Sequence, residues 1–414
     1  MAIVKKTVVW NVLRFFTLRK LAKFFSLFLV KDSFVYTFLK RLVFFRLAAE
    51  RVSFNKYQSL VYTGTRFYFF RYRDIVFAID SGPLNDTRGT GRVAKNLFAE
   101  LDRGLTNHSS GIDLKQLFLV DESRVDIYLY PSIQWADEQK LEKAALIVLD
   151  VLPVSLEYLF PEPRIREWQT KYKNFALQAK IVITISEWSA SEIIERVGIS
   201  KERLHIVPLG IEKNNAVDIK KAKKNIKILH EKYFIFIGSN DYHKNLDIVI
   251  NALSDESLSE CQLVVVGDNF TKAHKDYWKK ILANRIFFYG HLDDNETVQL
   301  LSRAEALLLP SFNEGFGLPP FEAAIQNVPS ICSDRPAMNQ VLREAALFAD
   351  PTNQDEWISA MNMVINRDKS VFEKLEKAKK LAENYEWNDF LKSLLAILQS
   401  SITSDDGVRS NNGR

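Results

Sequence analysis

The feature of this sequence that most constrains its fold is the alternation of short apolar runs with amphipathic stretches, which occurs in two sets. The strands expected in the first set are Ile75–Asp80, Gln116–Val120, Val125–Leu129, Ala144–Leu149, Ile181–Ile185 and His205–Val207. Those expected in the second set are Tyr233–Ile237, Gln262–Val266, Arg285–Tyr289, Ala306–Leu309 and Val328–Ile331. Such alternation predicts an α/β protein with two Rossmann-like, doubly wound parallel-sheet domains. A ligand is expected in the cleft between them.

The length of 414 residues also favours two or more domains. A polar, lysine-rich stretch separates the two sets of strands and reads as an exposed linker. The predicted organisation is a basic aromatic helical extension at 1–73, a first Rossmann-like domain at 74–212, a linker at 213–232, a second Rossmann-like domain at 233–385, a helix at 386–400 and a disordered polar tail at 401–414.

The net charge of +5 conceals a strongly basic N-terminal segment. Residues 1–51 hold eleven Lys and Arg against two acids, a local charge of +9, and nine of the 29 phenylalanines. Its uncharged runs are far shorter than the about 20 residues of a membrane-spanning helix, and no signal-peptide pattern occurs. The segment predicts amphipathic helices on an anionic membrane surface; the alternative is packing onto the protein's own first domain.

These patterns also indicate the compartment and exclude some partners. Basic charge confined to a phenylalanine-rich end argues against nucleic acid as a partner. Cys261 and Cys332 each border an apolar run and are expected to be buried thiols in a reducing compartment. The six histidines show no metal-ligand spacing, so no metal site is expected. We therefore expect a cytoplasmic location, with peripheral attachment to the inner face of the membrane if the N-terminal helices bind it.

A glycine-bearing loop within 310–323 carries the strongest chemical signal. Gly315 and Gly317 allow the backbone to approach a ligand closely, and Pro319 or Pro320 can open the following helix. The amides at a helix N-terminus favour an anion, whereas Glu314 and Glu322 are acceptors suited to hydroxyl groups. This combination predicts a ligand with phosphate at one end and hydroxyls at the other, such as a nucleotide sugar.

Glu314 and Glu322, with seven residues between them and with an apolar run on each side, resemble the paired-glutamate motif of the retaining GT-B glycosyltransferases of family 4. The resemblance implies a GT-B fold and transfer of a sugar from a nucleoside-diphosphate donor to a saccharide or lipid-linked acceptor, with retention and with no metal or cofactor. It places the acceptor in the first domain and the nucleotide sugar in the second. It also implies that the last helix crosses back to the first domain.

The resemblance implies the roles of individual residues. Lys244, with Glu314 the expected catalytic pair, follows a loop that opens with Gly238 and would face the departing diphosphate. Relatives usually add an arginine in this loop, where the chain has Ser239 and Asn240, so Arg92 is a candidate replacement by position only. Glu314 would hold sugar hydroxyls and Glu322 the ribose. The other residues expected at the nucleotide sugar are Gly89, Gly91, Asn240, Leu292, Gly315, Phe316, Gly317 and Leu318.

Three departures keep alternatives open. Besides Asn240 in the loop before Lys244, Leu149 stands where many relatives have histidine, and Gln340 where an acidic residue is common. The adjacent Asp150 either orients an acceptor hydroxyl or caps its own loop. A GT-B partner or binding subunit without turnover, and a nucleotide-sugar epimerase, remain as alternatives. In the loop around Lys244 and in the turn at 150–153 the chain resembles bacterial polysaccharide enzymes, which slightly favours mannose- or rhamnose-type sugars.

Overall fold

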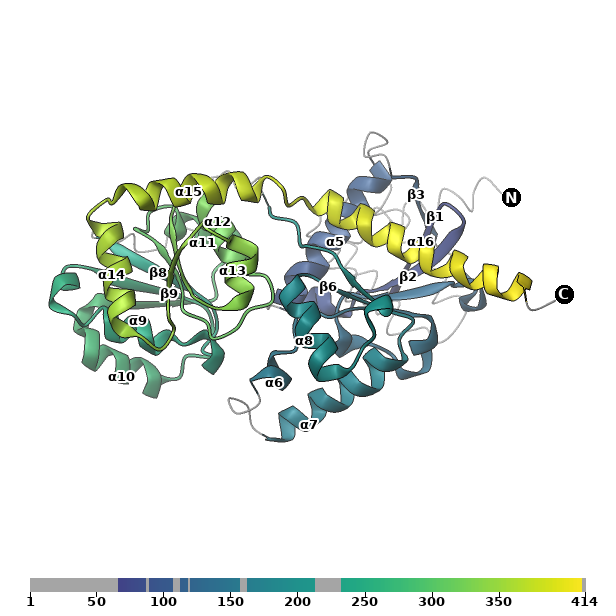
Figure 1. The fold of residues 1–414 in the computed structure, drawn as a ribbon, viewed down its shortest axis with the longest axis horizontal. Helices are drawn as coiled ribbons and strands as arrows, with labels where there is room; N and C mark the ends of the chain where they lie inside the picture. Colours follow the sequence, from purple (N-terminus) through teal and green to yellow (C-terminus); the bar gives the residue numbers. More distant parts are fainter. Residues whose placement is uncertain are drawn as a thin grey trace, which may run out of the picture. The chain divides into compact units, whose positions relative to one another are not determined.

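The computed structural model describes residues 66–86, 89–106, 112–117, 120–156, 162–212 and 232–411 (Figure 1). The chain divides into two compact units, Met1–Pro131 and Ser132–Arg414. The predicted basic aromatic helices of residues 1–65 and nearly all of the predicted linker lie outside the described residues. No helix among the described residues is long and apolar enough to cross a membrane.

The first unit contains a small mixed sheet. Strand β1 (Phe67–Tyr72) pairs antiparallel with both β2 (Ile75–Asp80) and β3 (Leu114–Leu117), and β2 pairs parallel with β4 (Ile127–Tyr130). Helix α5 (Gly89–Thr106) covers it. Strand β1 falls within the extension predicted to be helical up to residue 73. It is a strand because alternate side chains, Tyr68 and Phe70, are 3% and 2% exposed and pack on Phe98 and Phe77.

The second unit begins with three parallel strands, β5 (Ala144–Ile147), β6 (Ile181–Thr184) and β7 (Leu204–Ile206). Helices α6 (Leu152–Ser155), α7 (Glu162–Lys171) and α8 (Glu187–Val197) connect them. The sequence offers two serines that could cap α8, Ser186 and, as an alternative, Ser189. The structure uses Ser186, whose hydroxyl accepts the Ser189 N–H at 3.0 Å. It ends at Gly198, whose φ of 83° lies in the left-handed region that glycine adopts readily.

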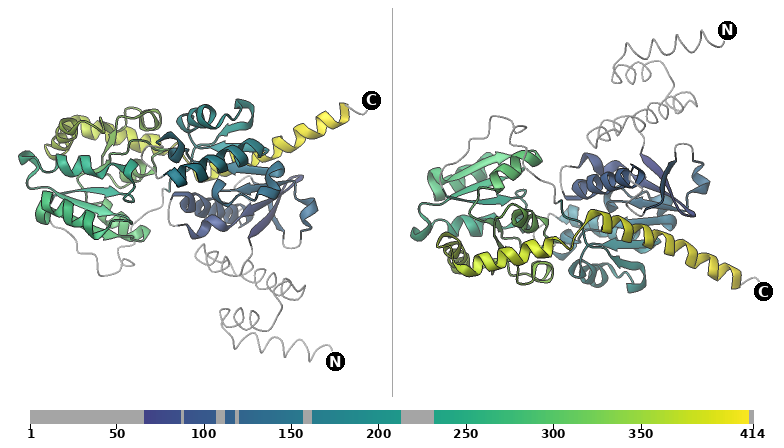
Figure 2. Two further views of the ribbon diagram at one scale, coloured as in Figure 1. Left: turned by 90° about the horizontal axis from the view of Figure 1, so that it is seen from below. Right: turned by 90° about the horizontal axis from the view of Figure 1, so that it is seen from above.

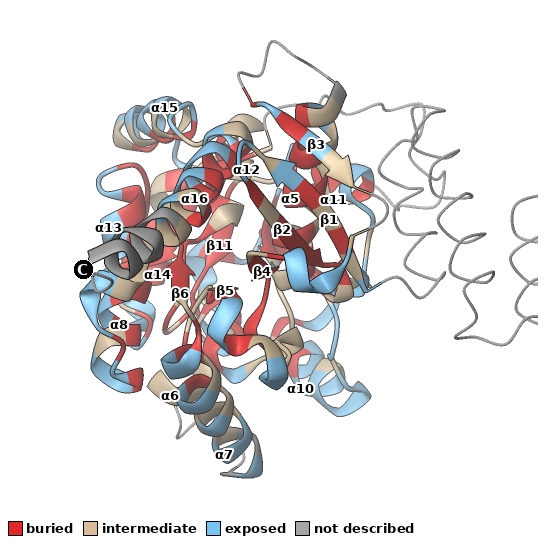
Figure 3. Cartoon of the chain, turned by 90° about the vertical axis from the view of Figure 1, so that its right-hand side faces the viewer, coloured by how far each residue is buried: buried red, intermediate tan, exposed pale blue. Residues whose placement is uncertain are grey.

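The second sheet of this unit is fully parallel, in the order β10-β9-β8-β11-β12-β13. Its strands are β8 (Tyr233–Ile237), β9 (Gln262–Val266), β10 (Ile286–Gly290), β11 (Leu307–Leu309), β12 (Ser330–Ser333) and β13 (Leu347–Ala349). The bounds of β8 and β9 are those predicted from sequence. Strands β8, β9, β11 and β12 are almost entirely buried (β11 is labelled in Figure 3), as expected for a parallel sheet covered on both faces. The edge strand β10 is mostly half-buried.

Alternate residues of β8 face the two helical layers of this sheet. Phe234 and Phe236 pack with α9 (Leu246–Ala252), α10 (Lys272–Leu282) and α14 (Gln354–Ile365) on one face. Tyr233 and Ile235 pack with α11 (Asp294–Leu301) and α12 (Leu318–Ile325) on the other (Figure 1). The doubly wound architecture expected from the alternating sequence is therefore present.

The C-terminal helices complete the second unit. Helix α13 (Pro336–Leu342) follows β12, and α15 (Lys369–Ala382) packs against α12. Helices α15 and α16 (Trp387–Asn411) follow one another along the molecule (Figure 2). Helix α16 continues beyond residue 400, where the polar composition predicted a disordered tail. The residues just before α16 contact the chain after β7, because Ile211 N–H donates to the Tyr385 carbonyl at 3.1 Å.

Candidate functional site

Lys244 and Glu314 lie at the carboxyl edge of the second sheet, where its strand order reverses. From β8 the chain continues to β9 and β10 on one side, then returns to β11 and builds the other side. The loops after β8 and β11 therefore diverge at the centre of the sheet. Lys244 ends the first loop and Glu314 lies in the second. In open α/β sheets such a topological switch point is where ligands bind.

The two side chains form a close ion pair. Lys244 Nζ donates to Glu314 Oε1 at 2.6 Å, and Ser311 Oγ donates to the same oxygen at 2.6 Å. The side chains are 20% and 14% exposed. Burial alone would favour the neutral acid, but the Lys244 charge, the neighbouring His243 and the two hydrogen bonds hold the pKa of Glu314 below its usual value. The site thus contains an ionised carboxylate against a cation.

Local backbone geometry sets the position of Lys244. It ends a 3₁₀ turn in which its N–H donates to the Asp241 carbonyl at 2.8 Å. Asn245 follows in the left-handed region with φ 51°. Its side-chain amide donates to the carbonyls of Pro310 at 3.2 Å and Pro351 at 2.8 Å. These bonds join the Lys244 loop to the chain just after β11 and just after β13.

His243 is buried next to this pair and holds the two loops together through its backbone. Phe312 N–H donates to the His243 carbonyl at 2.8 Å. His243 as a whole is only 8% exposed. Burial, and then the Lys244 charge, lower its pKa to about 4. His243 is therefore neutral at neutral pH and leaves Lys244 as the local cation.

The two glycines of the loop are required by close packing. A Cβ on Gly315 would lie 2.8 Å from the Leu149 carbonyl oxygen. Gly317 has φ +78°, and a Cβ there would lie 2.6 Å from Met338 Cε. Gly317 caps α12, which begins with Leu318 followed by two prolines. Since proline has no N–H, Leu318 supplies the only N–H of the first three helical residues. The start of α12 therefore offers an anion fewer amide donors than were expected from the sequence.

The side chain of Phe316 faces the protein interior. It is 3% exposed and packs edge-on against Tyr385, with ring centroids 5.2 Å apart. Only its backbone groups are available to a ligand. Glu322 lies half-buried in the second turn of α12.

Asp150 lies within electrostatic reach of the ion pair. Burial first, and then the Glu314 carboxylate, raise its pKa, although the Leu152 N–H and the Lys244 charge oppose them. Its Oδ1 accepts the Leu152 N–H at 3.2 Å, so the side chain caps its own turn. Tyr172 Oη donates to the Asp150 carbonyl at 2.7 Å. The loop-capping role is present, and the carboxyl faces the charges of the site.

The remaining residues predicted to bind the sugar donor lie on different elements of the structure. Asn240 contacts α10, with its side-chain nitrogen 2.7 Å from His274 Nδ1. Leu292 packs, half-buried, beside the apolar cluster of the α11–α12 face. Gly89, Gly91 and Arg92 belong to the first unit, where all three lie in the first turn of α5. A Cβ on Gly91 would lie 1.9 Å from the Asp86 carbonyl oxygen, so glycine is needed there for packing within the unit.

Two contacts on the Glu314 loop had no role in the sequence analysis. Ser186 Oγ donates to the Gly315 carbonyl at 2.6 Å, and Trp188 Nε1 donates to Asn313 Oδ1 at 2.8 Å. Ser311, whose hydroxyl donates to the Glu314 carboxylate, was also not predicted. The sequence identified Ser186 only as a helix cap. Its contact with Gly315 joins residues 129 positions apart, and no local pattern reports such a contact.

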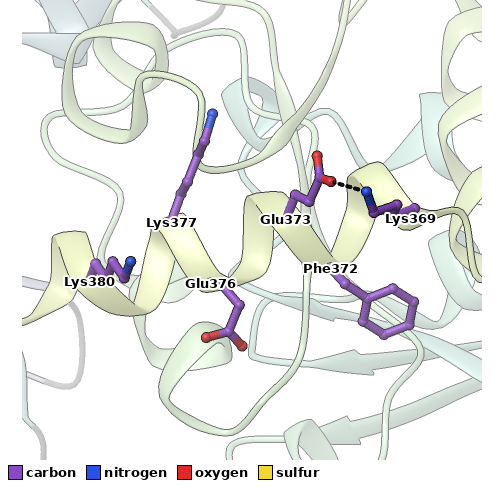
Figure 4. Close-up of a pocket in the computed structure, with 6 residues that line it drawn as sticks. All are labelled: Lys369, Phe372, Glu373, Glu376, Lys377 and Lys380. Carbon is purple, nitrogen blue, oxygen red and sulfur yellow. Dashed lines mark ion pairs between the residues drawn. The ribbon is translucent and has the colours of Figure 1, made fainter.

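A separate shallow hollow lies along α15 (Figure 4). Its lining comes from one helix and is mainly charged: Lys369, Phe372, Glu373, Glu376, Lys377 and Lys380. Lys369 and Glu373 pair with each other at 3.1 Å. No loop from a strand end contributes to it. It therefore lacks the convergent polar groups of a ligand site.

Comparison with known proteins identifies relatives in polysaccharide biosynthesis. The O-antigen chain mannosyltransferase RfbU of Salmonella typhimurium is 28% identical over 228 residues, which are 54% of this chain and 61% of that protein. The O-antigen chain mannosyltransferase B of Escherichia coli is 24% identical over 241 residues, 55% of this chain and 62% of that protein. The matches thus span about three fifths of these relatives.

Solved structures share the fold at low sequence identity. Anabaena Alr3699/HepE, in complex with UDP and glucose, matches with a TM-score of 0.54 at 18% identity, covering 67% of this chain and 79% of that one. WaaG, a glycosyltransferase involved in lipopolysaccharide biosynthesis, matches with a TM-score of 0.53 at 17% identity, covering 76% and 84%. Residues 218–386 match the family model of the glycosyl transferases group 1. The chain therefore has the GT-B fold, and its second Rossmann-like region is similar to the glycosyl transferases group 1.

Proposed function

We propose that the protein transfers a hexose or deoxyhexose, with mannose favoured, from a nucleoside-diphosphate sugar to a saccharide or lipid-linked acceptor, with retention at the anomeric carbon. The observation that carries this proposal is the Lys244–Glu314 pair at the switch point of the second sheet. The preference for mannose comes from the relatives, two of which are named O-antigen chain mannosyltransferases.

The chemistry of the pair suits the reaction. As the bond to the sugar breaks, negative charge builds on the departing diphosphate, and a fixed cation stabilises that charge. Lys244 would supply it as a point charge. Glu314, kept ionised, would accept hydrogen bonds from sugar hydroxyls. When the substrate binds, each side chain would exchange its partner in the pair for one on the substrate. The proposed reaction uses no metal or cofactor.

A screen of sugar donors tests the proposal. We would measure the melting temperature of the full chain with GDP-mannose, UDP-glucose and dTDP-rhamnose. A ligand at 100 times its Kd stabilises the folded state by about 2.7 kcal/mol, which is a shift of a few degrees. GDP-mannose is expected to give the shift. Binding without turnover would indicate a binding or partner subunit, and an altered sugar formed without acceptor would indicate an epimerase.

Substitution of the pair tests the site. Lys244→Ala and Glu314→Ala are each expected to reduce transfer at least about tenfold, because a charge-assisted contact contributes about 1.5–3 kcal/mol. Lys369→Ala and Glu373→Ala are matched controls, since these side chains are 91% and 60% exposed on α15. Near-normal turnover in both site variants, with folding intact, would refute the assignment.

We also propose that residues 1–51 attach the protein to an anionic membrane surface, where a lipid-linked acceptor would lie. The support is the local charge of +9 together with nine phenylalanines. Each basic residue near an anionic surface adds about 1 kcal/mol. Cosedimentation should show the full chain on vesicles with anionic lipid and not on zwitterionic ones. Equal binding by the full chain and by a chain that starts at residue 52 would contradict the proposal.

A further inference from the structure

The two sequence neighbours of Glu314 are both held by the first turn of helix α8. On one side, Trp188 Nε1 donates to Asn313 Oδ1 at 2.8 Å. On the other side, Ser186 Oγ donates to the Gly315 carbonyl at 2.6 Å, and Ser189 Oγ lies 3.3 Å from the same oxygen. The α8 turn that follows β6 thus holds the loop on both sides of Glu314 from outside the sheet that carries this loop.

The contacts with the Gly315 carbonyl are buried, and the one between Trp188 and Asn313 is partly buried. Ser186, Ser189 and Asn313 are 5%, 2% and 8% exposed. Ser189 Oγ also donates to the Leu149 carbonyl at 2.9 Å. That carbonyl oxygen would lie 2.8 Å from a Cβ on Gly315, so Gly315 is enclosed between α8 and the end of β5. Buried polar groups that lose their partners are costly, which makes this arrangement hard to deform.

The side chain of Glu314 is held separately from its backbone. Lys244 and Ser311 bind the carboxylate, whereas the α8 turn binds the residues before and after it. The carboxylate position therefore depends on both sets of contacts. A displacement of about 1 Å at a reacting group can lower a rate by about 100-fold.

We propose that Ser186, Trp188 and Ser189 are positioning residues that set the Glu314 carboxylate for the reaction. They act through the Gly315 carbonyl and the Asn313 side chain on either side of Glu314, and do not contact the sugar themselves. The inference rests on the proposed function, because it assigns these residues to the transfer that Glu314 serves. Losing these contacts should impair turnover more than sugar-donor affinity.

The first experiment needs no substrate. Hydrogen exchange of the backbone amides in 311–317 is measured in the full chain and in Trp188→Phe, Ser186→Ala and the double variant. Exchange there should be at least tenfold faster in the double variant. Ser191→Ala is the matched control on the same helix, because its hydroxyl donates only to the Trp188 carbonyl at 2.8 Å. Unchanged exchange in 311–317 would overturn the proposal.

The second experiment measures GDP released from GDP-mannose in the presence of acceptor saccharide. The double variant is expected to lose at least tenfold in kcat, with KM for GDP-mannose within threefold of the unaltered protein. Ser186→Thr retains the hydroxyl and should restore the rate relative to Ser186→Ala. Trp278→Phe is a second control, since that indole N–H donates to Asp247 at 2.6 Å, away from the loop.

The outcomes separate the two proposals. If the unaltered protein turns over no sugar donor of the panel, the proposed function fails, while the exchange experiment still decides whether α8 holds the loop. If exchange quickens but kcat is unchanged, the positioning role is overturned and the contacts are structural only. Equal losses in Ser186→Ala and Ser186→Thr would also overturn it.

Discussion

Replacing Lys244 with methionine would leave the Glu314 carboxylate with the Ser311 hydroxyl as its remaining side-chain partner among the bonds described above. The carboxylate is 14% exposed and the Nζ–Oε1 distance is 2.6 Å, so water can compensate for little of the lost charge. Removing one member of a buried pair typically costs about 3 kcal/mol. Lys244→Met should therefore reduce the free energy of unfolding by about 3 kcal/mol at neutral pH.

The reciprocal change should cost less. Glu314→Gln leaves the Lys244 ammonium, which is 20% exposed and sits on a flexible stem that can turn towards water. We expect a loss of about 1 kcal/mol. The double variant removes both charges and should cost about 2 kcal/mol, which gives a coupling energy of about 2 kcal/mol in a double-mutant cycle.

The pH dependence provides an independent check of sign. In the unaltered protein the pKa of Glu314 lies below its usual 4.5, so its stabilising contribution is present above that pH and is lost as the pH falls through the folded-state pKa. In Lys244→Met burial remains without the cation, and the pKa should rise above 4.5. Protonation then relieves the buried charge, and the penalty should shrink as the pH falls from about 7.5 to about 5.

Urea unfolding followed by circular dichroism measures the free energies of unfolding from which the penalties and the coupling energy are calculated. The unaltered chain, both single variants and the double variant are compared at both pH values. Lys369→Met serves as the control, because that side chain is 91% exposed and its loss should change stability little at either pH. A coupling energy near zero, or a Lys244→Met penalty that is the same at both pH values, would refute the reasoning.

Three further substitutions test other parts of the site by urea unfolding. His243 has a folded-state pKa of about 4 against an ordinary 6.5, so the unfolded chain takes up the proton first and stability falls as the pH drops between these values. His243→Asn should remove about 3 kcal/mol of that loss of stability. An unchanged dependence of stability on pH would contradict the lowered pKa of His243 as its cause. Gly317→Ala should lower the free energy of unfolding by about 2 kcal/mol or more, because φ is +78° and the new Cβ would lie 2.6 Å from Met338 Cε. Adding Met338→Ala should restore only part of this stability, since the backbone strain stays. Full recovery would show that crowding alone causes the loss. Asn245→Gly keeps the left-handed backbone but loses both hydrogen bonds to carbonyl groups, so it should lower the free energy of unfolding by about 1–2 kcal/mol. Asn245→Ala should lower it by about 1 kcal/mol more, because alanine is strained in this conformation. Equal losses in the two variants would show that the φ of 51° carries no strain.

Strands buried on both faces were the part of the fold best predicted from sequence. The predicted bounds of β8 and β9 match the structure, because runs such as Tyr233–Ile237 are continuously apolar and end at glycine. The Ser186 cap of α8 was also predicted, since capping depends on residues only a few positions apart.

Elements whose character depends on distant partners were not predicted. Strand β1 has the sequence FYFFRY and follows a basic aromatic stretch, so its composition suggested continued helix. Its pairing with β2 and β3, together with the burial of Tyr68 and Phe70, makes it a strand. The short strand β13 was also not among the predicted strands. Helix α5 begins at Gly89 although glycine is a poor helix former, and Thr90 helps by donating to Asp86 at 2.7 Å.

The spacing of the two glutamates has a structural basis in this chain. Glu314 lies in a loop, whereas Glu322 lies on α12, and the seven residues between them include the left-handed Gly317 that caps the helix. An inserted residue would rotate Glu322 by about 100° around α12 or move the glycine from its left-handed position. The motif therefore specifies a turn geometry as well as two acceptors. The sequence shows this spacing, but not the contacts from α8 and Lys244 that hold Glu314, since those contacts exist only once the distant segments have packed.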